Sequence, residues 1–407
     1  MTRRTARLAV AALAAAGLLA PAARAGGPPP ALSAPQAILV QPQTGDVLLR
    51  KDSEVPRPVA STTKLMTALL VLERVGLDDV FTAVPYAATP AESQIHLRAG
   101  ERLSVRDLLR ALLLESANDA AATLAAGTSG SQPAFVAQMN ARAQELGLTQ
   151  TAYANPIGLD QPGNHSSARD LVTLTGQLRR HAFFRRTVAL HSARLTTGSH
   201  TRLIENTNDL IGAVPYVDGV KTGHTEAARY VLVASATRRG VTMLSAVLGE
   251  PGKAARDADT VNLLRWGLDQ YRLAPIVLPD RVVARSEVKY RPDDRIELVP
   301  ARRVTHILRA GERPVVTLDA PRQLKGPLPQ GARAGTLTVR LRGRVIARVA
   351  LVTAQPVPEV SIFERAANRL LEPVTLVFLV FGAMAGGVLA MVVVRRRRAP
   401  KEPVASP

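Results

Sequence analysis

The chain has 407 residues, 46% of them hydrophobic, which is enough to bury the cores of two globular domains. It contains no cysteine, so disulfides, thiolate catalysis and cysteine zinc sites are excluded, and its seven histidines show no metal-binding spacing. The formal net charge is +19, but eight of these units lie at the two ends, in residues 1–25 and 395–407. The other basic residues are not clustered among aromatics, which argues against nucleic acid and favours a solvated surface in anionic surroundings such as cell wall or lipid headgroups.

Residues 1–25 have the three parts of a secretory signal peptide. A basic start precedes an apolar run from Leu8 to Ala20, and Ala23-Arg24-Ala25 forms a small-x-small cleavage site. The apolar run is too short to cross a bilayer comfortably, so cleavage is favoured over a permanent N-terminal anchor. The sequence therefore predicts an exported chain.

At the other end, residues 374–394 form an uncharged apolar segment of 21 residues, followed at once by four arginines. This pattern predicts a single transmembrane helix whose basic tail, residues 395–407, faces the cytoplasm. Ser361 and Glu364 form a capping box that predicts a juxtamembrane helix over residues 359–372. Gly382 and Gly386 would allow two spans to pack as a weak homodimer, although glycine is common in membrane helices in general.

Residues 32–272 combine helices and strands in the segregated pattern of an α+β domain. A hairpin is expected over residues 37–50, followed by an amphipathic helix that begins at Ser61 and has Leu65, Met66 and Leu69 on its apolar face. Further elements are helices at 104–114, 119–126 and 133–146, strands at 217–222, 230–236 and 241–248, and a closing helix that includes 261–271. Residues 275–355 consist of short β-branched runs between proline and glycine turns, which predict a small all-β domain serving as a spacer or docking unit.

Ser61 and Lys64 are the first candidate pair for catalysis. Side chains three residues apart on a helix lie on one face, about one turn from each other. A serine hydroxyl needs a neighbouring base to become a nucleophile, and a lysine is such a base only when burial or another cation lowers its pKa. A serine at a helix start is also a common N-cap, so this pair alone does not establish a catalytic site.

Two further motifs supply the other parts of an acyl-transfer site. Ser116 is placed to relay a proton to a leaving amine, and the Asn118 amide to hold Lys64 or a substrate amide. Lys221, Thr222 and Gly223 end a strand, where the charge and hydroxyl suit a terminal carboxylate and the glycine lets a peptide backbone approach. Lys221 is also a second cation that would lower the pKa of Lys64 by repulsion.

The order Ser-x-x-Lys, Ser-x-Asn, Lys-Thr-Gly is the signature of penicillin-binding proteins and serine β-lactamases. With the surrounding residues of each motif, and with 155–160, 165–170 and 217–225, residues 32–272 resemble the low-molecular-mass penicillin-binding proteins of the D-alanyl-D-alanine carboxypeptidase family. The resemblance implies a transpeptidase-type fold in a protein of the bacterial cell membrane. Its catalytic domain would face the wall and would need no metal or organic cofactor. It implies removal of the terminal D-alanine from peptidoglycan stem pentapeptides and acylation by β-lactams.

The same resemblance assigns a role to each site residue. Ser61 would form the acyl-enzyme, Lys64 would be the general base and Ser116 would assist proton transfer. The backbone N–H groups of Ser61 and His224 would form the oxyanion hole. Asn118, Lys221, Thr222, Gly223 and His224 are the expected substrate-binding residues.

Some features depart from the family pattern and leave alternatives open. Arg229 stands where relatives usually have glycine, which bears on specificity, and the β-rich domain resembles the family's second domain only loosely. Within the enzyme class, a D,D-endopeptidase remains open, as does a serine β-lactamase, for which Glu145 would be the deacylating residue. Outside it, the alternative is a wall-binding or scaffolding protein that holds stem peptides without turnover.

Overall fold

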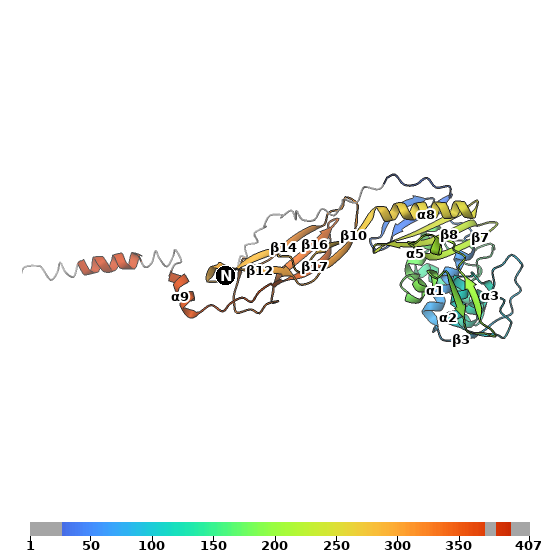
Figure 1. The fold of residues 1–407 in the computed structure, drawn as a ribbon, viewed down its shortest axis with the longest axis horizontal. Helices are drawn as coiled ribbons and strands as arrows, with labels where there is room; N and C mark the ends of the chain where they lie inside the picture. The colour runs from blue at the N-terminus through green and yellow to red at the C-terminus, as the bar shows by residue number, and fades with distance from the viewer. Residues whose placement is uncertain (1–26, 371–379, 392–407) are drawn as a thin grey trace, which may run out of the picture. The chain divides into compact units, whose positions relative to one another are not determined.

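The computed structural model describes residues 27–370 and 380–391, without the side chains of 367–370. The predicted signal peptide, residues 1–25, and the predicted basic tail, residues 395–407, lie outside the described residues. Of the predicted span over residues 374–394, residues 380–391 are described and are helical. In the part of the chain that the structure describes, no helix is long and apolar enough to cross a membrane. The described chain forms two compact units, one of residues 27–274 with 307–312 and one of 275–306 with the residues from 313 onward (Figure 1).

A five-stranded antiparallel sheet forms the centre of the first unit, with the strand order β2-β1-β9-β8-β7. The predicted hairpin and the predicted three-strand meander are both confirmed. Their strands are β1 Gln36–Gln41, β2 Asp46–Lys51, β7 Val217–Thr225, β8 Arg229–Arg238 and β9 Val241–Glu250. Strands β8 and β9 are buried along almost their whole length because helices cover both faces of the sheet.

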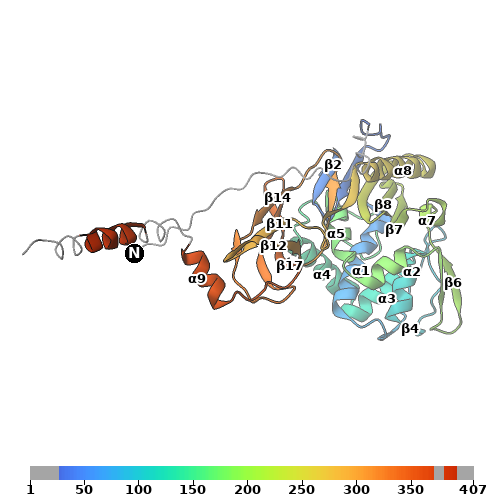
Figure 2. The same cartoon turned by 60° about the vertical axis from the view of Figure 1, so that its left-hand side comes forward.

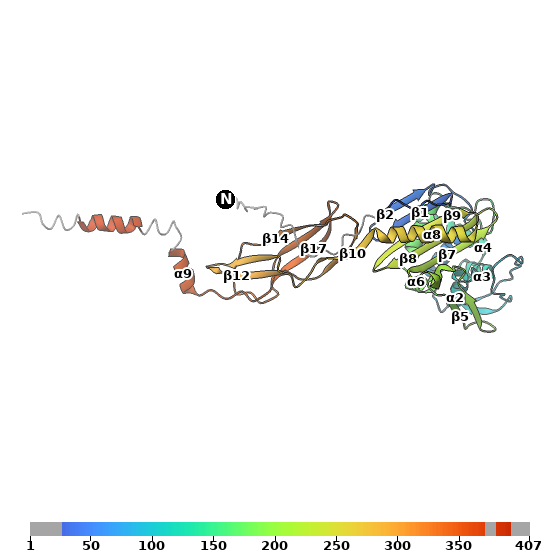
Figure 3. The same cartoon turned by 45° about the horizontal axis from the view of Figure 1, so that its top comes forward.

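One helix covers one face of this sheet and a group of helices covers the other (Figures 1 and 3). Helix α8 Lys253–Asp269 packs its leucines Leu263, Leu264 and Leu268 on the first face. On the opposite face, α1, α2 and α3 pack beside one another (Figure 2), and with α5 they bury the larger apolar core. The bounds of the helices are α1 Lys64–Arg74, α2 Val105–Leu113, α3 Asn118–Ser129, α4 Gln132–Glu145, α5 Ala168–Leu178, α6 Ala182–Val188 and α7 Leu210–Ala213.

Serine caps explain where three of these helices begin. The side chains of Ser104, Ser131 and Ser167 accept hydrogen bonds from backbone N–H groups in the first turns of α2, α4 and α5. At the other end of α3, Gly130 adopts a φ of 77°, the left-handed conformation that ends a helix and that glycine adopts without strain. These local signals agree with the predicted helices at 104–114, 119–126 and 133–146.

The helix expected to begin at Ser61 begins three residues later. Residues Ala60–Thr63 form a 3-10 turn, η1, and α1 starts at Lys64. In a 3-10 turn, side chains at i and i+3 lie above one another, so Ser61 and Lys64 still meet although they do not share an α-helix. The closing helix, expected to include residues 261–271, is α8 Lys253–Asp269; it ends before Tyr271, which lies in strand β10.

The second unit is built on a six-stranded sheet with the order β14-β16-β17-β12-β11-β15. Every paired neighbour in it is antiparallel except β11 with β15, which run parallel. Its strands are β11 Ala284–Val288, β12 Arg291–Pro300, β14 Val315–Asp319, β15 Gln323–Leu324, β16 Arg333–Leu341 and β17 Arg344–Thr353. The predicted β-rich character is confirmed, and helix α9 Ile362–Leu370 follows the last strand.

Two hairpins complete the first unit, and two further strands lie between the units in sequence. Strands β3 Val80–Thr82 and β4 Arg102–Ser104 form one hairpin, and β5 Ser192–Leu195 and β6 Arg202–Glu205 form another. Strands β10 Tyr271–Val277 and β13 Val304–Arg309 lie where the chain passes from one unit to the other in sequence.

Candidate active site

The side chains of Ser61 and Lys64 are in direct contact. Lys64 is the first residue of α1 and is fully buried, and its Nζ lies 3.0 Å from Oγ of Ser61 in the preceding 3-10 turn. This is hydrogen-bond distance, which a base needs in order to take a proton from a nucleophile. The pair predicted from spacing alone is therefore assembled.

Two carbonyl oxygens hold the same amine from other sides. Lys64 Nζ donates to Oδ1 of Asn118 and to the backbone oxygen of Ile157, both at 2.6 Å. These oxygens can only accept, so they take up two N–H bonds of the amine. In the neutral amine the remaining position is a lone pair, and it is directed to the hydroxyl of Ser61.

The surroundings of Lys64 favour this neutral form. Burial lowers the pKa of Lys64 well below its usual value, and the charge of Lys221 lowers it further. The carboxylates of Glu92 and Asp119 act in the opposite direction and raise this pKa. The repulsion from Lys221 is the effect that the sequence predicted, although burial is the larger cause.

Ser116 and Asn118 lie at the start of α3. Ser116 is buried with a φ of 65°, a left-handed conformation that is strained for a residue with a side chain, and its Oγ has no hydrogen-bond partner among the described residues. Asn118 is the first residue of the helix, and its backbone N–H donates to the Ser93 carbonyl. The strain and the buried free hydroxyl are typical of a residue kept for a substrate.

Strand β7 carries the Lys-Thr-Gly motif and is the last strand of its sheet. Gly223 packs so closely against the 3-10 turn that an added Cβ would lie 3.0 Å from both the Ser61 backbone nitrogen and the Ala60 Cβ. Glycine is thus what allows this strand to pass beside the serine. This close contact brings the Lys-Thr-Gly motif next to Ser61, although the two lie near opposite ends of the domain's sequence.

Lys221 is buried and close to charged groups. Burial lowers its pKa to about 7, the charge of Arg256 lowers it too, and that of Glu115 opposes the change. Its Nζ donates to the carbonyl oxygen of Thr222 at 3.2 Å, and the Thr222 hydroxyl lies 2.8 Å from that of Thr207.

His224 and Arg229 are the outer residues of this edge. The His224 side chain is exposed and packs on Tyr230 with 4.1 Å between ring centroids. Arg229 has a φ of 59°, a conformation that favours glycine, and its side chain is exposed. Within the described residues, no hydrogen bond joins the side chains of Thr222 or His224 to Ser61 or Lys64.

The structure adds residues that the sequence did not single out. Glu92 Oε2 accepts hydrogen bonds from Asn118 Nδ2 at 2.7 Å and from the Tyr86 hydroxyl, and Glu92 Oε1 accepts one from the Thr89 N–H at 3.0 Å. The carboxylate can only accept, so it fixes the amide of Asn118 with its nitrogen toward Glu92 and its oxygen toward Lys64. No motif marks Glu92 in the sequence.

Backbone groups near Ser61 were also missed. The Ile157 carbonyl that holds Lys64 belongs to a loop in which Gly158 has a φ of 91°. An added Cβ on Gly158 would lie 2.0 Å from the Ala60 carbonyl oxygen, so the loop packs directly on the 3-10 turn. The positive φ and the close approach both require glycine, and in the sequence the signal for this loop is the match of residues 155–160 to the family pattern. Among the described residues, no cluster of histidine and carboxylate side chains could hold a metal ion.

Comparison with known proteins decides the family. The family model for D-alanyl-D-alanine carboxypeptidase matches residues 23–252, more than half of the chain. This chain belongs to the D-alanyl-D-alanine carboxypeptidase family. It is a serine-type D-alanyl-D-alanine carboxypeptidase of the low-molecular-mass penicillin-binding class, as the resemblance implied.

Individual relatives of this carboxypeptidase agree with the assignment. The D-alanyl-D-alanine carboxypeptidase DacF of Bacillus subtilis (strain 168) is 32% identical over 326 residues, which cover 77% of this chain and 83% of the relative. The structure of penicillin binding protein 5 from Haemophilus influenzae is similar with a TM-score of 0.60 and 28% identity, over 82% of this chain and all of that one. The Streptomyces K15 DD-transpeptidase is similar with a TM-score of 0.56 and 32% identity, over 59% of this chain and 99% of its own.

Proposed function

We propose that this carboxypeptidase removes the terminal D-alanine of peptidoglycan stem pentapeptides through an acyl-enzyme on Ser61. The observation that carries the proposal is the placement of Lys64 Nζ, 3.0 Å from Ser61 Oγ and held by two carbonyl oxygens at 2.6 Å. A wall protein that only bound stem peptides would have no use for a buried lysine whose pKa is lowered beside a serine.

In the acylation step, Ser61 Oγ attacks the carbonyl carbon of the penultimate D-alanine while its proton passes to Lys64 Nζ. The backbone N–H groups of Ser61 and His224 receive the oxyanion of the tetrahedral intermediate. The bond from that carbon to the leaving nitrogen then breaks, and Ser116 delivers the proton from Lys64 to the amine of the departing D-alanine. Water then attacks the ester carbonyl carbon, its proton passes to Lys64 Nζ and on to Ser61 Oγ as the bond from that carbon to Oγ breaks, and the shortened peptide leaves.

The free edge of β7 is the proposed place of the substrate. An extended peptide pairs with the edge strand, and Lys221 with Thr222 binds its terminal carboxylate. Gly223 leaves room for the peptide backbone beside Ser61, and Asn118 contributes its amide. A β-lactam enters the same place and acylates Ser61, but its leaving nitrogen stays attached through the opened ring.

The experiment measures both turnover and labelling in the full chain. Incubation with a pentapeptide ending in D-Ala-D-Ala releases free D-alanine, and labelled penicillin attaches to Ser61. The variant Ser61→Ala abolishes both, whereas Ser192→Ala, which removes an exposed serine of the same unit, leaves both unchanged. No release and no labelling in the parent chain would overturn the proposal, and labelling that persists in Ser61→Ala would mean another nucleophile.

The proposed location is the outer side of a bacterial cell membrane, with a single C-terminal anchor over residues 374–394. Support comes from the apolar sequence, the arginines after it and the signal-peptide pattern at the start. Protease added to intact cells should digest the extracytoplasmic units and spare an epitope tag placed after residue 407. Digestion of the tag with the units intact would reverse the topology. A homodimer through Gly382 and Gly386 stays a prediction, which crosslinking of the full chain tests.

A further inference from the structure

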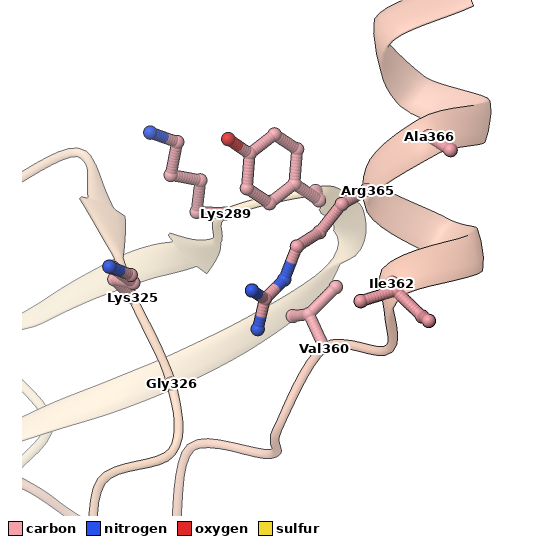
Figure 4. A pocket seen from close by; sticks show the side chains of 8 residues that line it. Lys289, Lys325, Gly326, Val360, Ile362, Arg365 and Ala366 are labelled. Atoms are coloured by element: carbon pink, nitrogen blue, oxygen red, sulfur yellow. The ribbon is translucent and has the colours of Figure 1, made fainter.

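A pocket of about 430 Å³ lies in the second unit, where the sheet meets helix α9. Lys289 follows strand β11, Lys325 follows strand β15, and Arg365 lies on α9. Figure 4 shows the two lysines on the sheet side of this pocket and Arg365 reaching into it from the helix. Three cations from three separate elements thus line one small volume, in the unit that does not contain Ser61.

The charges of this pocket are not balanced by its own lining. None of the lining residues is acidic, and among the described residues no ion-pair partner lies against Lys289, Lys325 or Arg365. The acidic residue nearest in sequence, Glu364, is engaged by Arg291 at 2.8 Å and by the Ser361 backbone N–H at 2.8 Å. Lys289 lies over the Tyr290 ring, 5.1 Å from its centroid. Three cations that line one pocket without a carboxylate are suited to a phosphate group.

Apolar side chains beside the cations indicate which phosphate this is. Ile362, which lines the pocket, and its neighbour Phe363 are 72% and 80% exposed on the first turn of α9. Exposed large apolar residues next to a basic pocket are typical of a surface that meets a lipid headgroup and the acyl region below it. The uncharged segment 374–394 begins four residues after α9 ends, so the chain itself carries this pocket close to any bilayer that holds the segment.

We propose that this pocket binds the phosphate of an anionic phospholipid headgroup. Lys289, Lys325 and Arg365 contact the phosphate oxygens, while Ile362 and Phe363 face the acyl chains. The proposal rests on the membrane location proposed above and goes beyond it, because it makes the second unit a reader of lipid charge and not only a spacer. A free phosphate ion would use the cations but not the exposed apolar pair.

The test titrates the full chain, purified in a non-ionic detergent, with short-chain phosphatidylglycerol and follows bound lipid by native mass spectrometry. The double variant Lys289→Gln with Lys325→Gln should weaken binding at least about tenfold, since each basic residue near a lipid surface contributes several-fold. The matched control, Arg295→Gln with Arg322→Gln, removes two cations from another surface pocket of the same unit and should leave binding unchanged. Arg365→Gln alone, which should weaken binding about fivefold, covers the case that the double variant folds poorly.

Three results would overturn the proposed phospholipid site. Equal loss in the pocket variant and the control would reduce the effect to general charge attraction. Equal binding of phosphatidylcholine would remove the requirement for an anionic headgroup, and inorganic phosphate that binds as tightly as phosphatidylglycerol would show that the pocket takes free phosphate. Release of D-alanine from a soluble pentapeptide should be the same in all variants, so a failure here is separate from a failure of the catalytic proposal. Because the lipid is presented in detergent, the result also does not depend on the topology experiment.

Discussion

The carboxylate of Glu92 accepts a hydrogen bond of 2.7 Å from the side-chain amide of Asn118. Since Asn118 in turn holds Lys64 at 2.6 Å, Glu92 sets the direction of the amide that holds the proposed base. Glu92 also accepts hydrogen bonds from Tyr86 and Thr89, so through Asn118 it joins their loop to Lys64.

Replacing Glu92 with alanine is therefore expected to slow acylation by penicillin about tenfold, the cost of losing one hydrogen bond to a charged group. The carboxylate raises the pKa of Lys64, so its loss lowers that pKa and moves the acid limb of the rate profile to lower pH. The measurement is the second-order acylation rate from pH 4 to pH 9. A slower rate with an unmoved acid limb would mean that Glu92 only stabilises the loop.

Glu145 provides the matched carboxylate for that experiment. It is largely exposed and pairs with Arg142 at 2.8 Å on the surface of α4, so Glu145→Ala should change neither acylation nor release of the acyl group. The β-lactamase alternative assigns Glu145 to deacylation. Slow deacylation in this variant, measured by the lifetime of the penicilloyl-enzyme, would therefore revive that alternative.

The dependence of kcat/KM on pH should be bell-shaped for a substrate with a free carboxylate. On the acid side the rate rises as Lys64, whose pKa is lowered, loses its proton and becomes a base. On the alkaline side the rate falls as Lys221, with a pKa of about 7, loses the charge that binds the carboxylate.

The variant Lys221→Gln separates the two limbs. It should raise KM and remove the alkaline limb, and because Lys221 lowers the pKa of Lys64, its loss should move the acid limb to higher pH. An alkaline limb that persists in Lys221→Gln would assign it to a different group.

Gly223→Ala should reduce kcat/KM at least about a hundredfold, as expected for a misplacement of about 1 Å at a reacting group. The added Cβ would lie 2.8 Å from Val231 Cγ2 and 3.0 Å from the Ser61 backbone nitrogen, so the strand or the serine must shift. Gly176→Ala in α5 is the control, since nothing lies within 4 Å of its Cβ and its φ is not positive. That control should keep full activity and gain about 1 kcal/mol in stability, and a comparable loss in both variants would count against the argument.

The buried ion pair of Glu101 and Arg202 gives a prediction for stability. The two side chains are joined at 2.9 Å and 3.0 Å, and the Ser199 N–H donates to the same carboxylate at 2.7 Å. Glu101→Ala should lower the free energy of unfolding by about 3 kcal/mol at pH 7, because it leaves the arginine charge buried without its partner.

The effect should shrink in acid. The pKa of Glu101 is lowered to about 2, below the value of about 4.5 expected for the unfolded chain, so its contribution is complete above pH 4.5 and is lost as the pH falls toward 2. Urea unfolding of parent and variant at pH 7 and pH 3 measures this. A difference that grows at pH 3 would contradict the assignment.

The sequence predicted the elements whose signals are local. The hairpin of β1 and β2 follows from alternation around a turn, and α2 begins at a serine cap that the sequence displays. It also predicted that Ser61 and Lys64 would meet, because residues three apart lie on one face, and that the Asn118 amide would hold either Lys64 or a substrate amide. The contacts between Lys64 and the other two residues agree with this.

What the sequence could not predict depends on contacts between distant segments. Glu92 lies in a stretch without periodicity, and its role comes from a partner 26 residues away. The carbonyl of Ile157 has no side-chain signal at all, since any residue supplies one. The sequence predicts a helix start at Ser61 where the structure has a 3-10 turn, because both conformations place residues three apart on one side.

The three partners of Lys64 have a consequence for the cost of moving a proton. Two of them accept N–H bonds whether the amine is neutral or charged, and the third position changes only from a lone pair that accepts to an N–H that donates to the serine oxygen. The lysine can thus exchange a proton with Ser61 Oγ without changing rotamer. The reorganisation that a mobile base would require is absent from this exchange.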